Sequence, residues 1–145
     1  MRLQMLTQRH DFLRVKSGVA WGSKGFLLQA IEQDPVDQSP GRSRFGITVS
    51  NHTVRRYLAQ KREKSGEKHQ KRGPVSVLRN RMRRRLRALL EQIAPEHAKP
   101  GIDYVIIGRP ALETLAFEIL RKDLQESFQK VHRRIISTSK HLSKS

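Results

Sequence analysis

Six of the nine residues in the run RNRMRRRLR, from Arg79 to Arg87, are arginines. The planar guanidinium group of arginine binds a phosphate through two parallel hydrogen bonds and stacks on exposed bases. Like charges at helical spacing repel one another, and the nearest acidic residue in the sequence is Glu91. A bound polyanion would relieve that repulsion, so the run predicts a phosphate-binding surface rather than a solvated basic face.

The apolar residues in and after this run predict the helix that presents it. One helical stripe holds Met82, Leu86, Leu89, Leu90 and Ile93. The side away from that stripe holds Asn80, Arg84 and Arg87, and its flanks hold Arg81, Arg83 and Arg85. We expect the helix to follow a short extended segment at 75–77 and to end before Pro95, because proline cannot continue a helix.

The other polar residues form no recognisable catalytic or metal-binding motif. The carboxylates are scattered along the chain, and the histidines show no HxH or HExxH spacing. Gly22 and Gly25 belong to no phosphate-binding loop, and the absence of cysteine excludes disulfides and thiolate chemistry. The sequence therefore predicts a binder of nucleic acid rather than a self-sufficient catalyst.

Composition supports the same interpretation. Thirty Lys and Arg residues against thirteen Asp and Glu residues give a formal net charge of +17 in a chain of 145 residues. Such a field attracts nucleic acid strongly, with an anionic membrane as the other candidate surface. The start of the chain is too polar for a signal peptide, so we expect an intracellular protein with one domain, 1–136, and a disordered tail, 137–145.

The first half of the chain is expected to contain a helix and two strands. A helix is predicted from Thr7, as cap, to Ser17, followed by a turn around Gly22 and Gly25. The apolar run from Phe26 to Ile31 and the alternating run from Phe45 to Ser50 predict two strands that form a hairpin across a loop at 34–41. The following segment, at about 51–73, is strongly basic and predicts a mobile loop inserted into the domain, with a helix near its start as the alternative.

The second half is expected to add the arginine helix, a strand and a helix. The run from Ile102 to Ile107 is the strongest strand candidate because it is rich in β-branched residues. A final amphipathic helix, with Thr114 as a plausible cap, is predicted by the stripe of Phe117, Leu120, Leu124, Phe128 and Val131. This order predicts an α+β or α/β sandwich of one small sheet with helices packed against it.

Several aromatic residues in the first half could stack on unpaired bases. They are Phe12, Trp21, Phe26, Phe45 and Tyr57. Phe26 and Phe45 lie on predicted strands and are expected in the core, whereas Phe12 and Trp21 are more open candidates.

At the arginine run the sequence resembles the protein subunit of bacterial ribonuclease P, the ribonucleoprotein that trims the 5′ leader from precursor tRNA. The family motif RNRxKRRLR follows a short strand, and here Ser76-Val77-Leu78 leads into Arg79–Arg87 with Arg83 at the lysine position. The resemblance extends to the N-terminal residues Asp11, Phe12, Val15 and Gly18, and to the runs RFGITVS from Arg44 and DYVIIGR from Asp103.

The resemblance implies a fold, and it implies that the RNA and not the protein carries out catalysis. The fold would be α+β, a two-layer α-β sandwich with a small mixed sheet, like one domain of a ribosomal protein. Catalysis would belong to the catalytic RNA and its Mg²⁺ ions, and the protein alone would be inactive. The partners would be that RNA and precursor tRNA, without a membrane, in the cytoplasm, and with one protein monomer for each RNA.

The resemblance also implies two sets of RNA-binding residues. The RNA-facing helix would use Arg79, Asn80, Arg81, Arg83, Arg84, Arg85 and Arg87, and the cleft for the single-stranded leader would use Phe12, Lys16, Phe26 and Arg44. Three positions depart from the family pattern: Lys16 replaces a second aromatic, Gln29 replaces a strand aromatic, and Asn51-His52 replaces a lysine pair. The leader cleft would then depend more on charge than on stacking, and the basic segment after Asn51 is expected to add RNA contact.

A second hypothesis places the chain in another class. A ribosomal or nucleoid-type architectural protein would carry the same charge without any part in catalysis. It would bind duplex DNA or ribosomal RNA with similar affinity and leave tRNA processing unchanged, so the two hypotheses differ in a measurable way.

Overall fold

The computed structural model describes residues 3–33, 42–65 and 75–143. Its elements follow the order β1 (Gln4–Met5), α1 (Arg9–Lys16), β2 (Val19–Gly22), β3 (Phe26–Glu32), β4 (Arg44–Thr48), α2 (Asn51–Ser65), α3 (Val75–His97), β5 (Ile102–Gly108), the 3₁₀ turn η1 (Pro110–Glu113) and α4 (Phe117–Ser143). The predicted strands at 26–31 and 102–107 and the arginine helix are confirmed.

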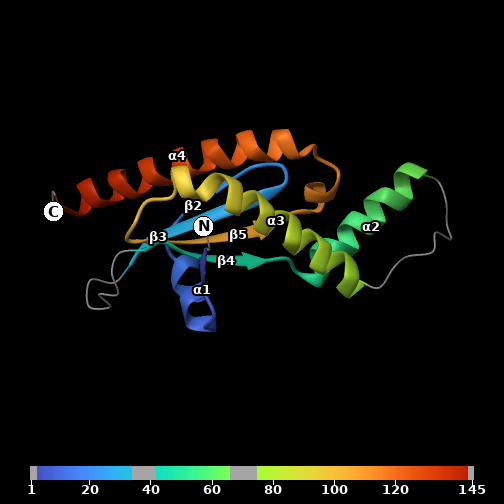
Figure 1. The fold of residues 1–145 in the computed structure, drawn as a ribbon, viewed down its shortest axis with the longest axis horizontal. Helices are drawn as coiled ribbons and strands as arrows, with labels where there is room; N and C mark the ends of the chain where they lie inside the picture. Colours follow the sequence, from blue (N-terminus) through green and yellow to red (C-terminus); the bar gives the residue numbers. More distant parts are fainter. Residues whose placement is uncertain (1–2, 34–41, 66–74, 144–145) are drawn as a thin grey trace.

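The five strands form one mixed sheet in the order β1-β4-β5-β3-β2. The pairs β1/β4 and β4/β5 are parallel, whereas β5/β3 and β3/β2 are antiparallel. The helices α3 and α4 cover one face of the sheet, and the short helix α1 packs on the other (Figure 1). This architecture confirms the α+β fold with a small mixed sheet.

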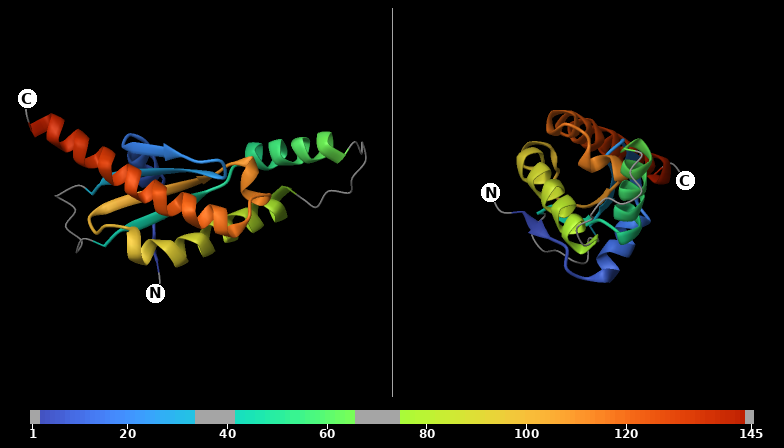
Figure 2. Two further views of the ribbon diagram at one scale, coloured as in Figure 1. Left: turned by 90° about the horizontal axis from the view of Figure 1, so that it is seen from above. Right: turned by 90° about the vertical axis from the view of Figure 1, so that its right-hand side faces the viewer.

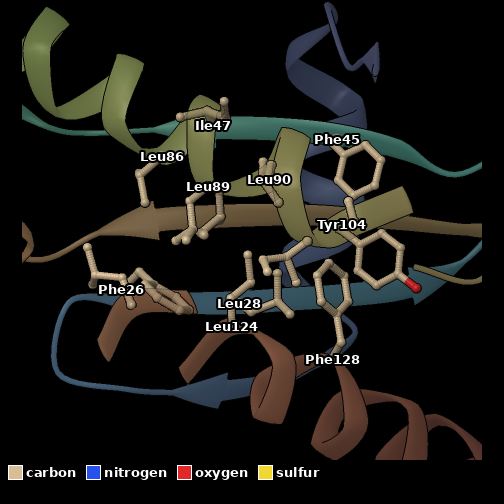
Figure 3. Close-up of a cluster of buried hydrophobic side chains, with 14 of the residues drawn as sticks. Phe26, Leu28, Phe45, Ile47, Leu86, Leu89, Leu90, Tyr104, Leu124 and Phe128 are labelled. Atoms are coloured by element: carbon tan, nitrogen blue, oxygen red, sulfur yellow. The ribbon is translucent and has the colours of Figure 1, made fainter. Parts of the chain in front are cut away.

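The main core lies between the sheet and the two long helices. The arginine helix contributes its predicted stripe, since Met82, Leu86, Leu89, Leu90 and Ile93 are all buried. The helix α4 contributes Leu120, Leu124, Phe128 and Val131, again as predicted. Figure 3 shows Leu86, Leu89 and Leu90 of α3 and Leu124 and Phe128 of α4 beside alternate residues of the central strands, such as Phe26 and Leu28 on β3. A second, smaller cluster holds Val15 of α1 against Val105 of β5.

The predicted hairpin is wrong. The strands β3 and β4 are not neighbours, because β5 lies between them and pairs with both. The partner of β3 on its other side is β2, a strand that was not predicted from the sequence. Strand β5 is buried along nearly its whole length, so it takes the central place that its hydrophobicity demands. The predicted loop at 34–41 lies outside the described residues.

The first part of the basic segment is helical, which is the alternative that the sequence left open near its start, and the helix is longer than expected. Residues Asn51–Ser65 form α2, and the remainder of the predicted loop, 66–73, lies outside the described residues. The backbone N–H of Thr53 donates to Ser50 Oγ (3.1 Å), which caps the helix. Val54 and Tyr57 are buried where α2 meets α3 and η1, and these contacts make the segment helical despite its charge.

The ends of the long helices also differ from the predictions. Helix α3 includes the segment predicted to be extended and continues through Pro95 to His97. The buried residues Ile93 and Ala94 hold the turn before the proline against the core, and this packing outweighs the preference of a pre-proline residue for extended backbone.

At the C-terminus, α4 continues into the predicted disordered tail as far as Ser143, past Ile135, which extends the buried stripe by another turn. Thr7 and Thr114 do not cap helices as predicted: Gln8 precedes α1 without a side-chain bond, and Thr114 follows η1.

Candidate nucleic-acid interface

The arginine helix presents two chemically different flanks. On the flank that faces η1 and α4, an oxygen of Glu113 accepts a hydrogen bond from Arg81 Nη2 at 2.5 Å. The bond and the charge of Glu113 raise the pKa of Arg81 above its ordinary value. On the same flank, Arg85 donates to the carbonyl of Leu115 and lies over the ring of Phe117, 5.9 Å from its centroid. Both arginines therefore bind other parts of the protein, although the Arg81 side chain is still 60% exposed.

The opposite flank lines a groove. Asn80, Arg83, Arg84 and Arg87 form its rim, together with Met5 of β1, Ile47 of β4 and Val77 of α3. The groove has a volume of about 520 Å³. Arg87 pairs with Glu91 at 3.2 Å, but both side chains are about half exposed, and such surface pairs are weak and exchange readily. The groove therefore places cations and an amide around an apolar surface.

Arg79 occupies an intermediate position on the helix. It is half-buried, and its Nε atom has no hydrogen-bond partner among the described residues. The structure thus divides the seven predicted residues into a rim of four, two that bind η1 and the segment before α4, and one that lies deeper. The sequence alone could not make this division, because it depends on where η1 and β4 lie around the helix.

The α1 face of the sheet carries the second set of predicted residues. The ring of Phe12 lies directly over Gly46, so closely that any side chain at position 46 would overlap it. Lys16 is exposed at the end of the same helix. Half-buried Gln29, which the resemblance placed in the leader cleft, lies on this face as well, together with half-buried Leu27 and Ile107, which the sequence did not indicate as contacts. Strand alternation from Ile31, which packs beside Val15, was the signal that could have found them.

A buried carboxylate ties α1 to the sheet beside Phe12. Asp103 is fully buried and accepts hydrogen bonds from Arg44 Nε (3.0 Å) and Nη2 (2.7 Å) and from Gln33 Nε2 (2.9 Å). Arg14 of α1 binds the same carboxylate. Arg44 is therefore near Phe12 as predicted, but much of its hydrogen-bonding capacity is directed at Asp103 and it has a positioning role.

Phe26 does not belong to the predicted leader cleft. Its side chain is fully buried on the sheet face that α3 and α4 cover, whereas Phe12 lies on the opposite face. Successive residues of a strand point to opposite faces, and Phe26 shares its face with Leu28 and Ala30. The sequence-based expectation that Phe26 and Phe45 are core residues is confirmed, and Phe45 stacks on Tyr104 at 5.4 Å.

The remaining aromatic candidates, Trp21 and Tyr57, also pack against other parts of the protein. Trp21 packs against α4, where Lys130 and Arg134 lie 5.2 Å and 4.9 Å from its ring centroid. Tyr57 is buried at the base of α2. Among the predicted stacking residues, Phe12 is therefore the one left half-buried on the α1 face.

The described part of the chain shows no grouping of three or more His, Asp or Glu side chains that could hold a metal ion. Within that same part, no helix has the length and apolar character needed to cross a membrane.

Comparison with known proteins agrees with this arrangement. A sequence model of the family Ribonuclease P matches residues 68–132. A ribonuclease P protein component from Paramagnetospirillum magneticum is 36% identical over 90% of this chain and 84% of its own length. The corresponding component from Ruegeria pomeroyi is 30% identical over 90% and 87%.

Solved structures share the fold. The RNase P protein of Staphylococcus aureus superposes with a TM-score of 0.59 and 18% identity, over 88% of this chain and 94% of that one. The RNase P protein of Thermotoga maritima gives a TM-score of 0.55 and 22% identity, over 85% and 93%.

Proposed function

This chain belongs to the ribonuclease P protein family, and from that premise we propose that it holds precursor tRNA while an RNA subunit cleaves the 5′ leader. As a ribonuclease P protein component it partners the ribonuclease P RNA and takes part in tRNA processing. The finer assignments below concern which surface binds which RNA and where the chemistry occurs.

The single observation that supports the proposal is the placement of the arginine-lined groove and the Phe12 ring on opposite sides of β4. Ile47 lines the arginine groove on one face, and its neighbour Gly46 lies under Phe12 on the other. We assign the groove on α3 to the ribonuclease P RNA and the α1 face, with Phe12 and Lys16, to the single-stranded leader. A base can stack on the half-buried ring of Phe12, and the lysine can contact a phosphate.

Cleavage would belong to the RNA subunit, and the protein alone would be inactive. Hydrolysis of a phosphodiester by divalent ions needs ligands gathered around the metal. The described carboxylates do not gather in this way, which supports Mg²⁺ held by phosphates of the RNA subunit. Arginine and lysine side chains would reduce the repulsion between the two RNAs and so lower the Mg²⁺ concentration required. We place this activity in the cytoplasm, with one protein monomer for each RNA.

The test is cleavage of a 5′-extended precursor tRNA at low Mg²⁺ by the ribonuclease P RNA alone, the protein alone, and both together. Activity only in the mixture is the expected result. A protein that binds the RNA tightly without stimulating cleavage would instead be architectural, which is the second hypothesis.

A pair of matched variants tests the assignment of the groove. R83Q/R84Q removes two cations from its rim, and R121Q/K122Q removes two exposed cations from α4. If both rim arginines contact phosphates, the first variant should reduce the slope of log K against log salt by roughly 1.5–2, and the second should leave it unchanged. Equal effects would mean that only total charge matters.

A further inference from the structure

The groove beside α3 differs from a surface that binds only phosphates, because its interior is apolar. Met5, Ile47 and Val77 lie between the cationic side chains of the rim. Val77 is 58% exposed, which makes it one of the few large hydrophobic residues left open to solvent in the described part of the chain. Phosphate oxygens gain nothing from an apolar surface, whereas the face of a base does.

The wall of the groove also offers backbone hydrogen-bonding groups. Strand β1 ends at Met5, and the last backbone hydrogen bond on that side runs from Leu6 N to the carbonyl of Phe45 (2.7 Å). Residues two apart on a strand direct their backbone groups to the same side, so Ile47 directs its N–H and C=O to this outer edge. No other described backbone group bonds to Ile47 there. Figure 3 shows Ile47 on β4, beside α3.

The polar rim completes a set of groups suited to one nucleotide. Asn80 carries a side-chain amide, with two donors and an acceptor, and it is exposed next to the arginines. Arg83, Arg84 and Arg87 can hold the phosphates on either side of a base that has left its stack. A volume of about 520 Å³ is within the usual range of small-ligand sites and accommodates a base with its sugar.

We propose that this groove binds one unpaired, unstacked nucleotide of the ribonuclease P RNA, with its base against Val77 and Ile47 and its flanking phosphates on the arginine rim. The inference rests on the proposed function, since the RNA partner is the ribonuclease P RNA. It adds that the arginine helix recognises a particular feature of that RNA, an extruded base, and not only its charge.

The test measures the affinity of the full-length protein for the ribonuclease P RNA as a function of salt. V77A removes apolar surface and keeps a strong helix former. We expect roughly a three- to tenfold loss of affinity at every salt concentration, with an unchanged salt slope, because an apolar contact releases no counterions. V77L should retain wild-type affinity. I136A, which truncates another exposed aliphatic residue on a helix, is the matched control and should have no effect.

A second measurement identifies the form of RNA that the groove prefers. Binding of V77A to a single-stranded RNA oligonucleotide should be weakened, whereas binding to the fully paired duplex of the same sequence should equal that of the wild type. A loss confined to precursor tRNA, with ribonuclease P RNA unaffected, would assign the groove to the other RNA and overturn the proposal.

The inference and the proposed function can fail separately. If the wild type stimulates cleavage and R83Q/R84Q lowers the salt slope while V77A binds both RNA forms like the wild type, the groove binds phosphates only and the inference is wrong. If the wild type does not stimulate cleavage at all, the proposed function is wrong.

Discussion

The α1 face, which we propose binds the leader, depends on one buried carboxylate. The carboxylate of Asp103 is fully buried and joins Arg14 of α1 to Arg44 of β4. It therefore determines both the position of α1 and the orientation of a cation beside Phe12. The side chains of Arg14 and Arg44 are about a quarter exposed, whereas Asp103 is fully buried, so water reaches the guanidinium groups but not the carboxylate.

Replacing Asp103 by Asn should destabilise the protein. The substitution keeps the shape but removes the buried charge that Arg14 and Arg44 share, and only the more distant Asp11, 3.8 Å from Arg44, stays beside them among the described carboxylates. This loss should reduce the free energy of unfolding by roughly 2–4 kcal/mol. Urea denaturation measures the loss. E91Q, which breaks the exposed pair with Arg87, serves as the control and should cost less than about 0.5 kcal/mol. A D103N protein as stable as the wild type would show that the network does not hold α1.

A second buried polar pair makes stability sensitive to acid. Tyr104 accepts a hydrogen bond from the backbone N–H of Lys99 (2.9 Å) and donates its own hydroxyl proton to His132 Nε2 (2.6 Å). Burial, together with the charges of Lys99 and His97, lowers the pKa of His132 to about 4. Burial also raises the pKa of Tyr104. His132 is therefore the neutral acceptor of this pair in the folded state.

The free energy of unfolding should fall as the pH drops from about 6.5 towards 4. In this window the unfolded chain binds a proton at His132 and the folded chain does not, so stability is complete above the unfolded pKa and is lost below it. The loss should be on the order of 2–3 kcal/mol, measured by urea denaturation across the pH range. H132Q should flatten the profile in this window, whereas H52Q, at an exposed position on α2, should not. An identical profile for H132Q and the wild type would assign the acid sensitivity to other groups.

At the scale of elements, the structure depends on two close approaches to the sheet. On one face, α3 and α4 bury their predicted stripes against β3, β4 and β5. On the other, α1 can approach β4 because Gly46 leaves room for the ring of Phe12. Helix α1 is short, with a single fully buried residue, Val15, so its docking depends on this contact and on the Asp103 network.

Enlarging Gly46 should displace α1. In G46A the new Cβ overlaps the Phe12 ring, which should cost about 1–3 kcal/mol of stability and weaken leader binding together. The double variant G46A/F12L should recover stability, because the flexible leucine can move aside, but not the stacking contribution to leader affinity. Denaturation and binding of single-stranded RNA separate the two effects. If G46A were neutral in both, Phe12 would not be held by this contact.

Helix α2 extends from the same end of the sheet as η1 and projects beyond it (Figure 2). Only its first turns are anchored, through Val54 and Tyr57, and the described side chains from Ala59 to Glu63 are exposed. Its exposed cationic side chains include Arg55 and Arg56 in the anchored turns and Lys61 beyond them. The expectation that this segment adds RNA contact stays a prediction.

For the whole molecule, charge is the dominant long-range property. The net charge of +17 is spread over a small fold, and self-repulsion opposes compaction. Within the described residues the cations that meet carboxylates are few, and the rim of the groove on α3 remains strongly positive. Both of the proposed RNA-binding surfaces lie within this field, which speeds association with a polyanion and makes affinity depend on salt.

The free protein should become more stable when salt is added at low ionic strength. Sodium chloride screens the repulsion among its cations, so the midpoint of thermal unfolding should rise by a few degrees between low and physiological salt. Affinity for RNA should fall over the same range. A midpoint that falls with salt would mean that attractive ion pairs, such as those of Asp103, outweigh the repulsion.

The sequence by itself determined the parts whose structure depends on local periodicity and composition. Spacing, β-propensity and charge predict the stripe from Met82 to Ile93, the strand at 102–107, the amphipathic helix from Phe117 and the dense positive charge of Arg79–Arg87. The resemblance to ribonuclease P proteins rests on the same residues. Each of these features can be predicted from one segment alone, without knowing which segments pack against it.

Only the tertiary structure decided the features that depend on which segments meet. It inserted β5 between β3 and β4, made the start of the basic segment a helix by packing Val54 and Tyr57, and carried α3 through Pro95. It placed Phe26 in the core rather than beside Phe12, and it divided the arginines between Glu113 on one flank and the groove on the other. The physical reason is that burial and ion pairing are properties of two partners, whereas a sequence pattern describes one segment at a time.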